Sequence, residues 1–210
     1  MEFKAVIFDL DGVICSTDKY HYIAWKQMAD NLGVYFDEII NNRLRGVSRM
    51  ESLEIILERY EGSLCEEKKE KLAEEKNNIY KELLKQMSEK DLTEEVKNTL
   101  DTLRAQGKKL AIGSSSKNAK FILGQLGLGD YFDAISDGTN ISRSKPDPEV
   151  FIKAAEFLGL EESKCLVVED AKAGILAAHN GGFKSAGLGE AADSELVTYP
   201  LKTFSDLLNI

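Results

Sequence analysis

The sequence predicts a doubly wound α/β fold with a helical insertion. Short apolar runs at residues 5–8, 110–112 and 165–168 each end in polar or acidic residues. Apolar residues at helical spacing lie between these runs, and a long stretch after the first run shows helical spacing alone. Alternation of this kind is typical of a parallel sheet with helices on both faces.

The three apolar runs are predicted to be buried parallel strands, because short apolar segments bounded by polar residues fit strands that are covered on both faces. A helix is also expected over residues 118–126. Two further core helices are indicated by apolar residues at helical spacing, namely Val96, Leu100 and Leu103, and Val150, Phe151, Ala154, Ala155 and Leu158.

The insertion is expected to be a helical cap domain over residues 16–87. It shows no strand pattern, and its charge-rich segment 66–76 fits a solvated helix face. Residues 1–15 and 88–210 would then form the core domain, a doubly wound, Rossmann-like parallel sheet. The helical spacing in the insertion is carried by Leu53, Ile56, Leu57 and Tyr60 and by Leu72, Ile79, Leu83 and Met87.

Composition and charge exclude several classes of protein. A chain of 210 residues with 43% hydrophobic residues can bury a core. Its net charge of -9 argues against a nucleic-acid partner. No apolar run reaches the roughly 18 residues of a membrane helix, and the first residues lack a leader pattern. We therefore expect a cytoplasmic monomer with no membrane partner, and free thiols at Cys15, Cys65 and Cys165.

Acidic and hydroxyl side chains follow the predicted strands. Asp9 and Asp11 follow the first strand, Ser114 follows the second, and Glu169 and Asp170 close the third. Carboxyl ends of parallel strands meet at one edge of a sheet, where open α/β sheets bind ligands. Asp9, Asp170 and a main-chain carbonyl near Asp11 are hard oxygen ligands of the kind that Mg²⁺ prefers. A lone aspartate there often caps a helix or turn, but four acids at two strand ends favour a magnesium site.

Two further features fit the binding of a phosphate group. The segment Ser114-Ser115-Ser116 lies between a strand and a predicted helix, where hydroxyls and helix-start amides can hold an anion, although serine runs also form plain caps. Lys145 precedes Pro146, which restrains Lys145 from helical geometry. A surface lysine is the plainer interpretation, but an ammonium group held in this way can neutralise phosphoryl oxygens during transfer.

Together these residues resemble the four motifs of the haloacid dehalogenase superfamily. In chain order the motifs are Asp9-Leu10-Asp11-Gly12-Val13, Ser114, Lys145-Pro146 and Glu169-Asp170. The resemblance implies a Mg²⁺-dependent phosphotransferase with Asp9 as nucleophile and Asp11 as general acid/base. It also implies phosphate binding by Ser114, Ser115 and Lys145, and a metal site made by Asp9, Asp11, Glu169 and Asp170.

A second set of residues comprises His21 with Ala24-Trp25-Lys26, Arg45-Gly46-Val47-Ser48-Arg49 with Ser52-Leu53, Lys76-Asn77, and Ser116-Lys117-Asn118. Together these are similar to the β-phosphoglucomutases, which interconvert β-glucose 1-phosphate and glucose 6-phosphate through a bisphosphate. By this resemblance the substrate is a small sugar phosphate, and Arg49 with residues 116–118 binds its distal phosphate. Trp25 has helical spacing with Met28 and Leu32, which also fits packing within the cap. Arg45 stands where the family usually has lysine, so sugar preference stays open. The substrate-binding candidates are Thr17, His21, Trp25, Arg45, Gly46, Val47, Ser48, Arg49, Ser52, Lys76, Ser116, Lys117 and Asn118.

Three alternatives remain open. A sugar-phosphate phosphatase would use the same site with water as the phosphoryl acceptor. A signalling receiver domain also combines a doubly wound fold, clustered acids and a lysine. Receivers, however, carry the phosphorylated aspartate well inside the chain and have no helical insertion. A non-catalytic relative would lack part of the catalytic series, whereas every position is present here.

Overall fold

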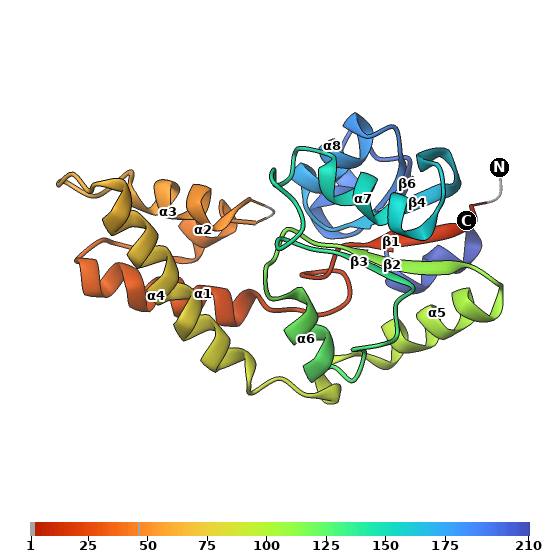
Figure 1. The fold of residues 1–210 in the computed structure, drawn as a ribbon, viewed down its shortest axis with the longest axis horizontal. Helices are drawn as coiled ribbons and strands as arrows, with labels where there is room; N and C mark the ends of the chain where they lie inside the picture. Colours follow the sequence, from red (N-terminus) through yellow and green to blue (C-terminus); the bar gives the residue numbers. More distant parts are fainter. Residues whose placement is uncertain (1–2, 46) are drawn as a thin grey trace.

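The computed structural model describes residues 3–45 and 47–210, and its sheet confirms the predicted α/β fold (Figure 1). Six strands lie in the order β3-β2-β1-β4-β5-β6, and every neighbouring pair is parallel. The strands are β1 (Ala5–Phe8), β2 (Lys109–Gly113), β3 (Ala134–Ser136), β4 (Cys165–Glu169), β5 (Lys184–Gly187) and β6 (Tyr199–Pro200). The three predicted strands are β1, β2 and β4, which lie side by side, whereas the sequence does not predict β3, β5 or β6.

Helices cover both faces of the sheet. Helices α5 (Glu94–Ala105) and α6 (Ala119–Gln125) lie below it in Figure 1, while α7 (Glu149–Leu158) and α8 (Lys172–Asn180) lie above it. Side chains of β1 alternate between the two layers, because successive residues of a strand point to opposite faces. Val6 and Phe8 pack with the α5 and α6 side, and Ala5 and Ile7 pack with α7 and α8.

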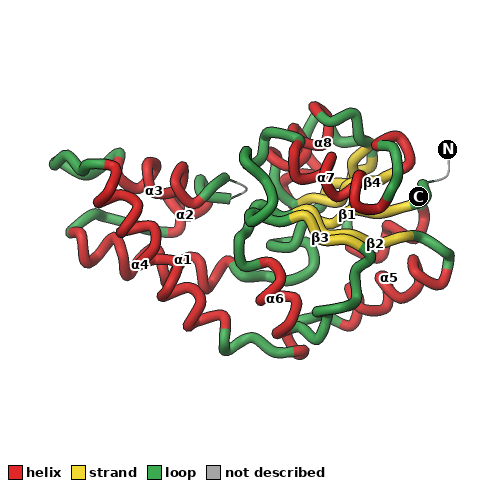
Figure 2. Tube along the Cα trace, in the orientation of Figure 1, coloured by secondary structure: helices red, strands yellow, loops and turns green. Residues whose placement is uncertain are grey.

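The chain leaves the sheet after β1 and forms a separate group of helices (Figure 2). These are α1 (Asp18–Leu32), α2 (Glu38–Asn42), α3 (Arg49–Leu57) and α4 (Glu66–Leu84). They enclose an apolar cluster of their own that includes Trp25, Met28, Phe36, Leu53 and Ile56. The predicted helical insertion is therefore present, and the domain boundaries at residues 15/16 and 87/88 stay a prediction.

The buried face of α4 differs from the predicted stripe by about one position. Leu72, Ile79 and Leu83 are only half-buried. The fully buried residues are Ala73, Lys76, Asn77, Tyr80 and Leu84. The difference arises because this helix buries polar side chains, which a hydrophobic pattern does not reveal. Among the described helices, none is both long and apolar enough to cross a bilayer.

Gly174 allows α8 to approach the end of β4. A Cβ atom at Gly174 would lie 1.9 Å from the carboxyl carbon of Glu169. The Glu169 side chain is only 1% exposed, so it has no solvent space into which it can move. The close approach of helix and strand therefore depends on the missing side chain.

We expect Gly174→Ala to lower the free energy of unfolding by about 1–3 kcal/mol, because the new methyl group displaces Glu169. The matched control is Gly124→Ala in α6, where an added Cβ meets nothing within 4 Å. That variant should raise stability by roughly 0.5–1 kcal/mol, since alanine favours helix more than glycine. Urea denaturation measures both variants, and equal effects of the two substitutions would contradict the close approach.

Candidate active site

Three carboxylates meet where β1 and β4 end. Asp9 follows β1, and its backbone N–H donates to the carbonyl oxygen of Val168 in β4 at 2.9 Å. This bond holds the end of one strand against the other. Asp9, Glu169 and Asp170 each place a carboxylate oxygen within 4.8 Å of the other two. The carboxylate of Asp11 does not belong to this group.

The three acids repel one another in a buried place. Burial, followed by the charges of Asp9 and Glu169, raises the pKa of Asp170 to about 8. Burial also raises the pKa of Glu169 to about 7, although the charge of Lys145 opposes this shift. Hard oxygen donors under mutual repulsion fit a divalent cation such as Mg²⁺. Asp9, Glu169 and Asp170 are thus the residues that could hold the ion.

Gly12 makes room for one of these acids. Its φ is +90°, which favours glycine, and a Cβ there would lie 2.0 Å from Oδ2 of Asp170. The turn after β1 also closes through a bond from the Gly12 N–H to the Cys15 carbonyl oxygen at 2.7 Å. The glycine of the first motif therefore forms a cradle for the carboxylate from β4.

Lys145 is the cation of the carboxylate group. Its side chain is 3% exposed, and its ammonium group donates to both Asp9 and Glu169. Burial alone would lower the pKa of Lys145, but the charges of Asp9 and Glu169 outweigh burial and raise it above the ordinary value. The ammonium also lies 4.7 Å from the centre of the Phe151 ring. Lys145 is therefore a fixed positive charge beside Asp9.

Asp11 lies outside the group of Asp9, Glu169 and Asp170, and the hydroxyl of Thr17 donates to its carboxylate. Burial and the charge of Asp9 raise the pKa of Asp11 to about 7. A carboxyl group with such a pKa can both release and accept a proton near neutrality. Thr17 is fully buried and does not itself line the cavity.

The serine segment after β2 satisfies its own backbone. The hydroxyl of Ser114 accepts from the N–H of Ser116 at 3.2 Å, and the hydroxyl of Ser116 accepts from the N–H of Asn118 at 3.2 Å. These two backbone N–H groups therefore already have acceptors within the segment and are not available to bind an anion. The serine hydroxyl protons remain available as donors.

A buried lysine lies on the cap side of the cavity. Lys76 is 2% exposed, and its ammonium group lies 2.9 Å from Nδ1 of His21. It also lies 4.7 Å from the Trp25 ring and 4.6 Å from the Tyr80 ring. Burial, followed by the charge of Arg49, lowers the pKa of Lys76 to about 7. Burial and the charge of Lys76 also lower the pKa of His21 well below its usual value.

Arg49 is the second cap cation. It is the first residue of α3, whose capping box is formed by Ser48 and Glu51. The positive end of the helix dipole disfavours a cation at this place, so an anion there would stabilise both the dipole and the guanidinium. One nitrogen of Arg49 donates to Asn77 at 2.8 Å, and Asn118 donates to the same oxygen of Asn77 at 3.0 Å.

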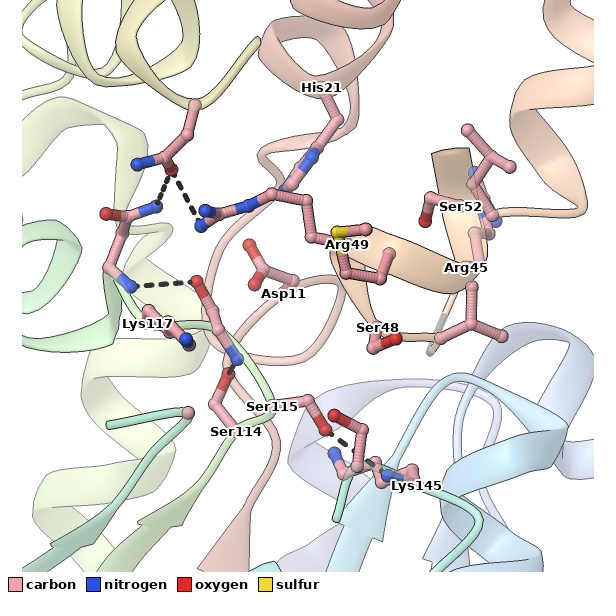
Figure 3. A pocket seen from close by; sticks show the side chains of 18 of the residues that line it. Asp11, His21, Arg45, Ser48, Arg49, Ser52, Ser114, Ser115, Lys117 and Lys145 are labelled. Atoms are coloured by element: carbon pink, nitrogen blue, oxygen red, sulfur yellow. Dashed lines mark hydrogen bonds between the residues drawn. The ribbon is translucent and has the colours of Figure 1, made fainter. Parts of the chain in front are cut away.

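These groups line one cavity of about 650 Å³. In Figure 3, Asp11 lies between Arg49 on one side and Ser114 and Lys145 on the other. Arg45 pairs with Asp18 at the rim. Gly46 lies outside the described residues. The candidates that line the cavity are Asp9, Asp11, His21, Trp25, Arg45, Val47, Ser48, Arg49, Ser52, Lys76, Ser114, Ser115, Ser116, Lys117, Asn118, Lys145, Glu169 and Asp170.

Several cavity residues are absent from the sequence-based set, among them Asp18, Asn77 and Tyr80. Tyr80 stacks on His21 with 4.1 Å between ring centres. Asn77 and Tyr80 share the buried face of α4 with Ala73 and Leu84. Tyr80 lies four residues after Lys76 and Asn77 lies four residues after Ala73, so helical spacing along this buried face indicates both.

Several known proteins are similar to this chain over most of its length. A β-phosphoglucomutase from Bacillus subtilis (strain 168) is 41% identical over 189 residues, which cover 89% of this chain and 84% of the relative. A phosphorylated carbohydrates phosphatase from Thermotoga maritima is 32% identical over 184 residues, or 86% of this chain and 82% of the relative. The crystal structure of β-phosphoglucomutase from Clostridium difficile superposes with a TM-score of 0.89 at 37% identity, covering 98% of this chain and 93% of that one.

The family model for haloacid dehalogenase-like hydrolases matches residues 3–182. This match spans the carboxylate group, Lys145 and the whole insertion. The chain therefore belongs to the haloacid dehalogenase-like hydrolase family.

Proposed function

We propose that this protein is a β-phosphoglucomutase, which interconverts β-D-glucose 1-phosphate and glucose 6-phosphate through a phosphoaspartyl enzyme and glucose 1,6-bisphosphate. The observation that carries the proposal is a second cationic region in the same cavity as Asp9. Arg49 and Lys117 line the cavity together with Lys145, the cation beside Asp9. A substrate with phosphates at both ends needs such a pair of regions, whereas a monophosphate needs only one.

In the proposed reaction, Asp9 carries the phosphoryl group and passes it to a sugar hydroxyl. Lys145 neutralises negative charge on the transferring group, because its ammonium is held against Asp9. Asp11 takes the proton of the attacking hydroxyl and returns it in the reverse step. Mg²⁺, held by Asp9, Glu169 and Asp170, would supply further positive charge beside the phosphoryl group.

The bisphosphate must then turn so that its other phosphate reaches Asp9. Cavities for small ligands measure about 300–1,000 Å³, and the volume of about 650 Å³ here falls within that range. In the proposal, Arg49 and residues 116–118 hold the distal phosphate in either orientation. Lys76 and His21 lie where they would contact the sugar hydroxyls.

A sugar-phosphate phosphatase is the second candidate, because the 32% identical relative from Thermotoga maritima is a phosphatase of phosphorylated carbohydrates. In that reaction water takes the phosphoryl group from Asp9. The two functions share the carboxylate group and differ in what reaches Asp9 when the cap is closed. The proposal also includes action in the cytoplasm as a monomer, which remains a prediction.

The first test supplies β-glucose 1-phosphate, Mg²⁺ and a trace of the bisphosphate. We expect glucose 6-phosphate to accumulate with little free phosphate, as measured by a coupled dehydrogenase assay and a phosphate assay. Release of phosphate without glucose 6-phosphate would instead support the phosphatase. Asp9→Asn is the control, because an amide cannot act as the nucleophile, and turnover by this variant would refute both functions.

A second test separates the two ends of the cavity with Arg49→Ala. We expect this variant to lose roughly 10- to 100-fold in kcat/KM for the sugar phosphate, as expected when a charged hydrogen bond to the substrate is removed. Phosphorylation of Asp9 by acetyl phosphate should be spared, because that donor has no distal phosphate. Equal loss in both assays would place Arg49 outside the distal site.

A third test concerns the stability cost of burying Lys76. Its pKa falls from 10.5 to about 7 on folding, so the unfolded chain binds more protons between these values and the residue's contribution to stability rises with pH there. We expect Lys76→Met to raise the free energy of unfolding by about 1–3 kcal/mol near pH 6. The gain should shrink toward pH 10, while mutase activity falls at every pH. Urea titrations across pH measure the gain, and a gain that is constant with pH would contradict the shift.

A further inference from the structure

One amide oxygen joins the cap to the core in the wall of the cavity. Oδ1 of Asn77, on α4, accepts a hydrogen bond from Nη2 of Arg49 at 2.8 Å and a second from Nδ2 of Asn118 at 3.0 Å. Arg49 belongs to α3 of the cap, whereas Asn118 stands at the start of α6 in the core. These two bonds, drawn as dashed lines in Figure 3, bring both donors to one acceptor.

Arg49 determines which side-chain atoms of Asn77 and Asn118 are donors and which are acceptors. A guanidinium only donates, so the atom of Asn77 that faces Arg49 must be its oxygen. Since this oxygen also faces Asn118, the Asn118 atom that faces it must be the amide nitrogen. The orientation of Arg49 therefore fixes the orientation of Asn77, and Asn77 fixes that of Asn118.

The side chain of Asn118 binds Asn77 and does not form the capping bond to its own helix that is common at this position. Asparagine at the residue before a helix normally accepts a hydrogen bond from the helix backbone. The side chain of Asn118 occupies that position before α6 but forms no capping bond there. Both Asn77 and Asn118 are largely buried, at 9% and 6% exposure. The side chain of Asn118 thus bonds to Asn77 of the cap and not to the backbone of its own helix.

Arg49 has no carboxylate within ion-pair distance among the described residues. Burial lowers its pKa below the usual value, although the charges of Tyr80 and Glu74 oppose this shift. Asn77 supplies a neutral acceptor that holds the guanidinium without cancelling its charge. Four of the five guanidinium N–H donors carry no bond to Asn77 and are left for a ligand.

We propose that Asn77 is a positioning residue that presents Arg49 and Asn118 together to the distal phosphate of the substrate. The inference rests on the proposed function, in which Arg49 and residues 116–118 hold that phosphate. Asn77 need not touch the reacting atoms, because it acts through Arg49 and Asn118. Its neutral oxygen aligns two donors from the two parts of the molecule on one anion.

The test compares Asn77→Ala and Asn77→Asp with the control Asn78→Ala, a neighbouring exposed asparagine on the same helix. Asn77→Ala should raise KM for the sugar phosphate roughly 3- to 10-fold, with a smaller effect on kcat and none on Asp9 phosphorylation by acetyl phosphate. Asn77→Asp keeps an acceptor for both donors but places a negative charge beside Arg49, so its KM should rise at least as much. Asn78→Ala should behave as the unsubstituted protein.

A double-mutant cycle with Arg49→Ala distinguishes positioning from a general loss of structure. If Asn77 acts through Arg49, Asn77→Ala should add little to KM once Arg49 is gone. Independent effects that multiply, or an Asn77→Ala KM equal to that of the unsubstituted protein, would overturn the inference. If Arg49→Ala also leaves KM unchanged, the distal phosphate site of the proposed function fails as well, so the two failures are separable.

Discussion

The close approach of three carboxylates and one ammonium group at the ends of β1 and β4 governs the rest of this structure. Asp9, Glu169 and Asp170 lie within 4.8 Å of one another, and Lys145 pairs with two of them. Burying like charges is unfavourable unless cations or protons compensate them. The acids nevertheless lie together because β1 and β4 are adjacent parallel strands, hydrogen-bonded along their length, that end at the same edge of the sheet. A divalent cation would reduce the remaining repulsion between the carboxylates.

The α/β core and the inserted helical cap contribute different groups to the cavity. The core holds the groups that would act on a phosphoryl group. Asp9, Asp11 and Asp170 follow strand ends, and Lys145 lies in the loop between β3 and α7. The helices inserted after β1 hold Arg49, His21 and Lys76, which face the same cavity. In the proposed function, the cap would therefore decide whether a sugar hydroxyl or water reaches the phosphoryl group on Asp9, because the carboxylates serve both reactions alike.

The sequence predicts those elements whose own residues form a recognisable pattern, such as a continuous apolar run. Strands β1, β2 and β4 are continuous apolar runs because the sheet covers them on both faces. Strands β3 and β6 have only three and two residues, and β5, although as long as β1, is made of lysine, serine, alanine and glycine, so their own residues carry little signal. Asp9, Ser114 and Asp170 are likewise predictable because each directly follows a predicted strand, whereas Lys145 is indicated only by the proline after it. Asn77 escapes prediction because its role comes from Arg49, 28 positions away, and Asn118, 41 positions away.

Polar residues on the buried face of α4 oppose stability, which favours a functional reason for their presence. An apolar side chain at Lys76 would pack between Trp25 and Tyr80 without the cost of desolvating an ammonium group. The cap instead maintains its fold through the separate apolar cluster around Trp25 and Ile56. A helix needed only for packing would have no use for a lysine and an asparagine at consecutive buried positions. A helix that must bind a polar sugar while excluding water would need them, because Lys76 would offer a donor to the sugar and Asn77 would hold Arg49 in place for its phosphate.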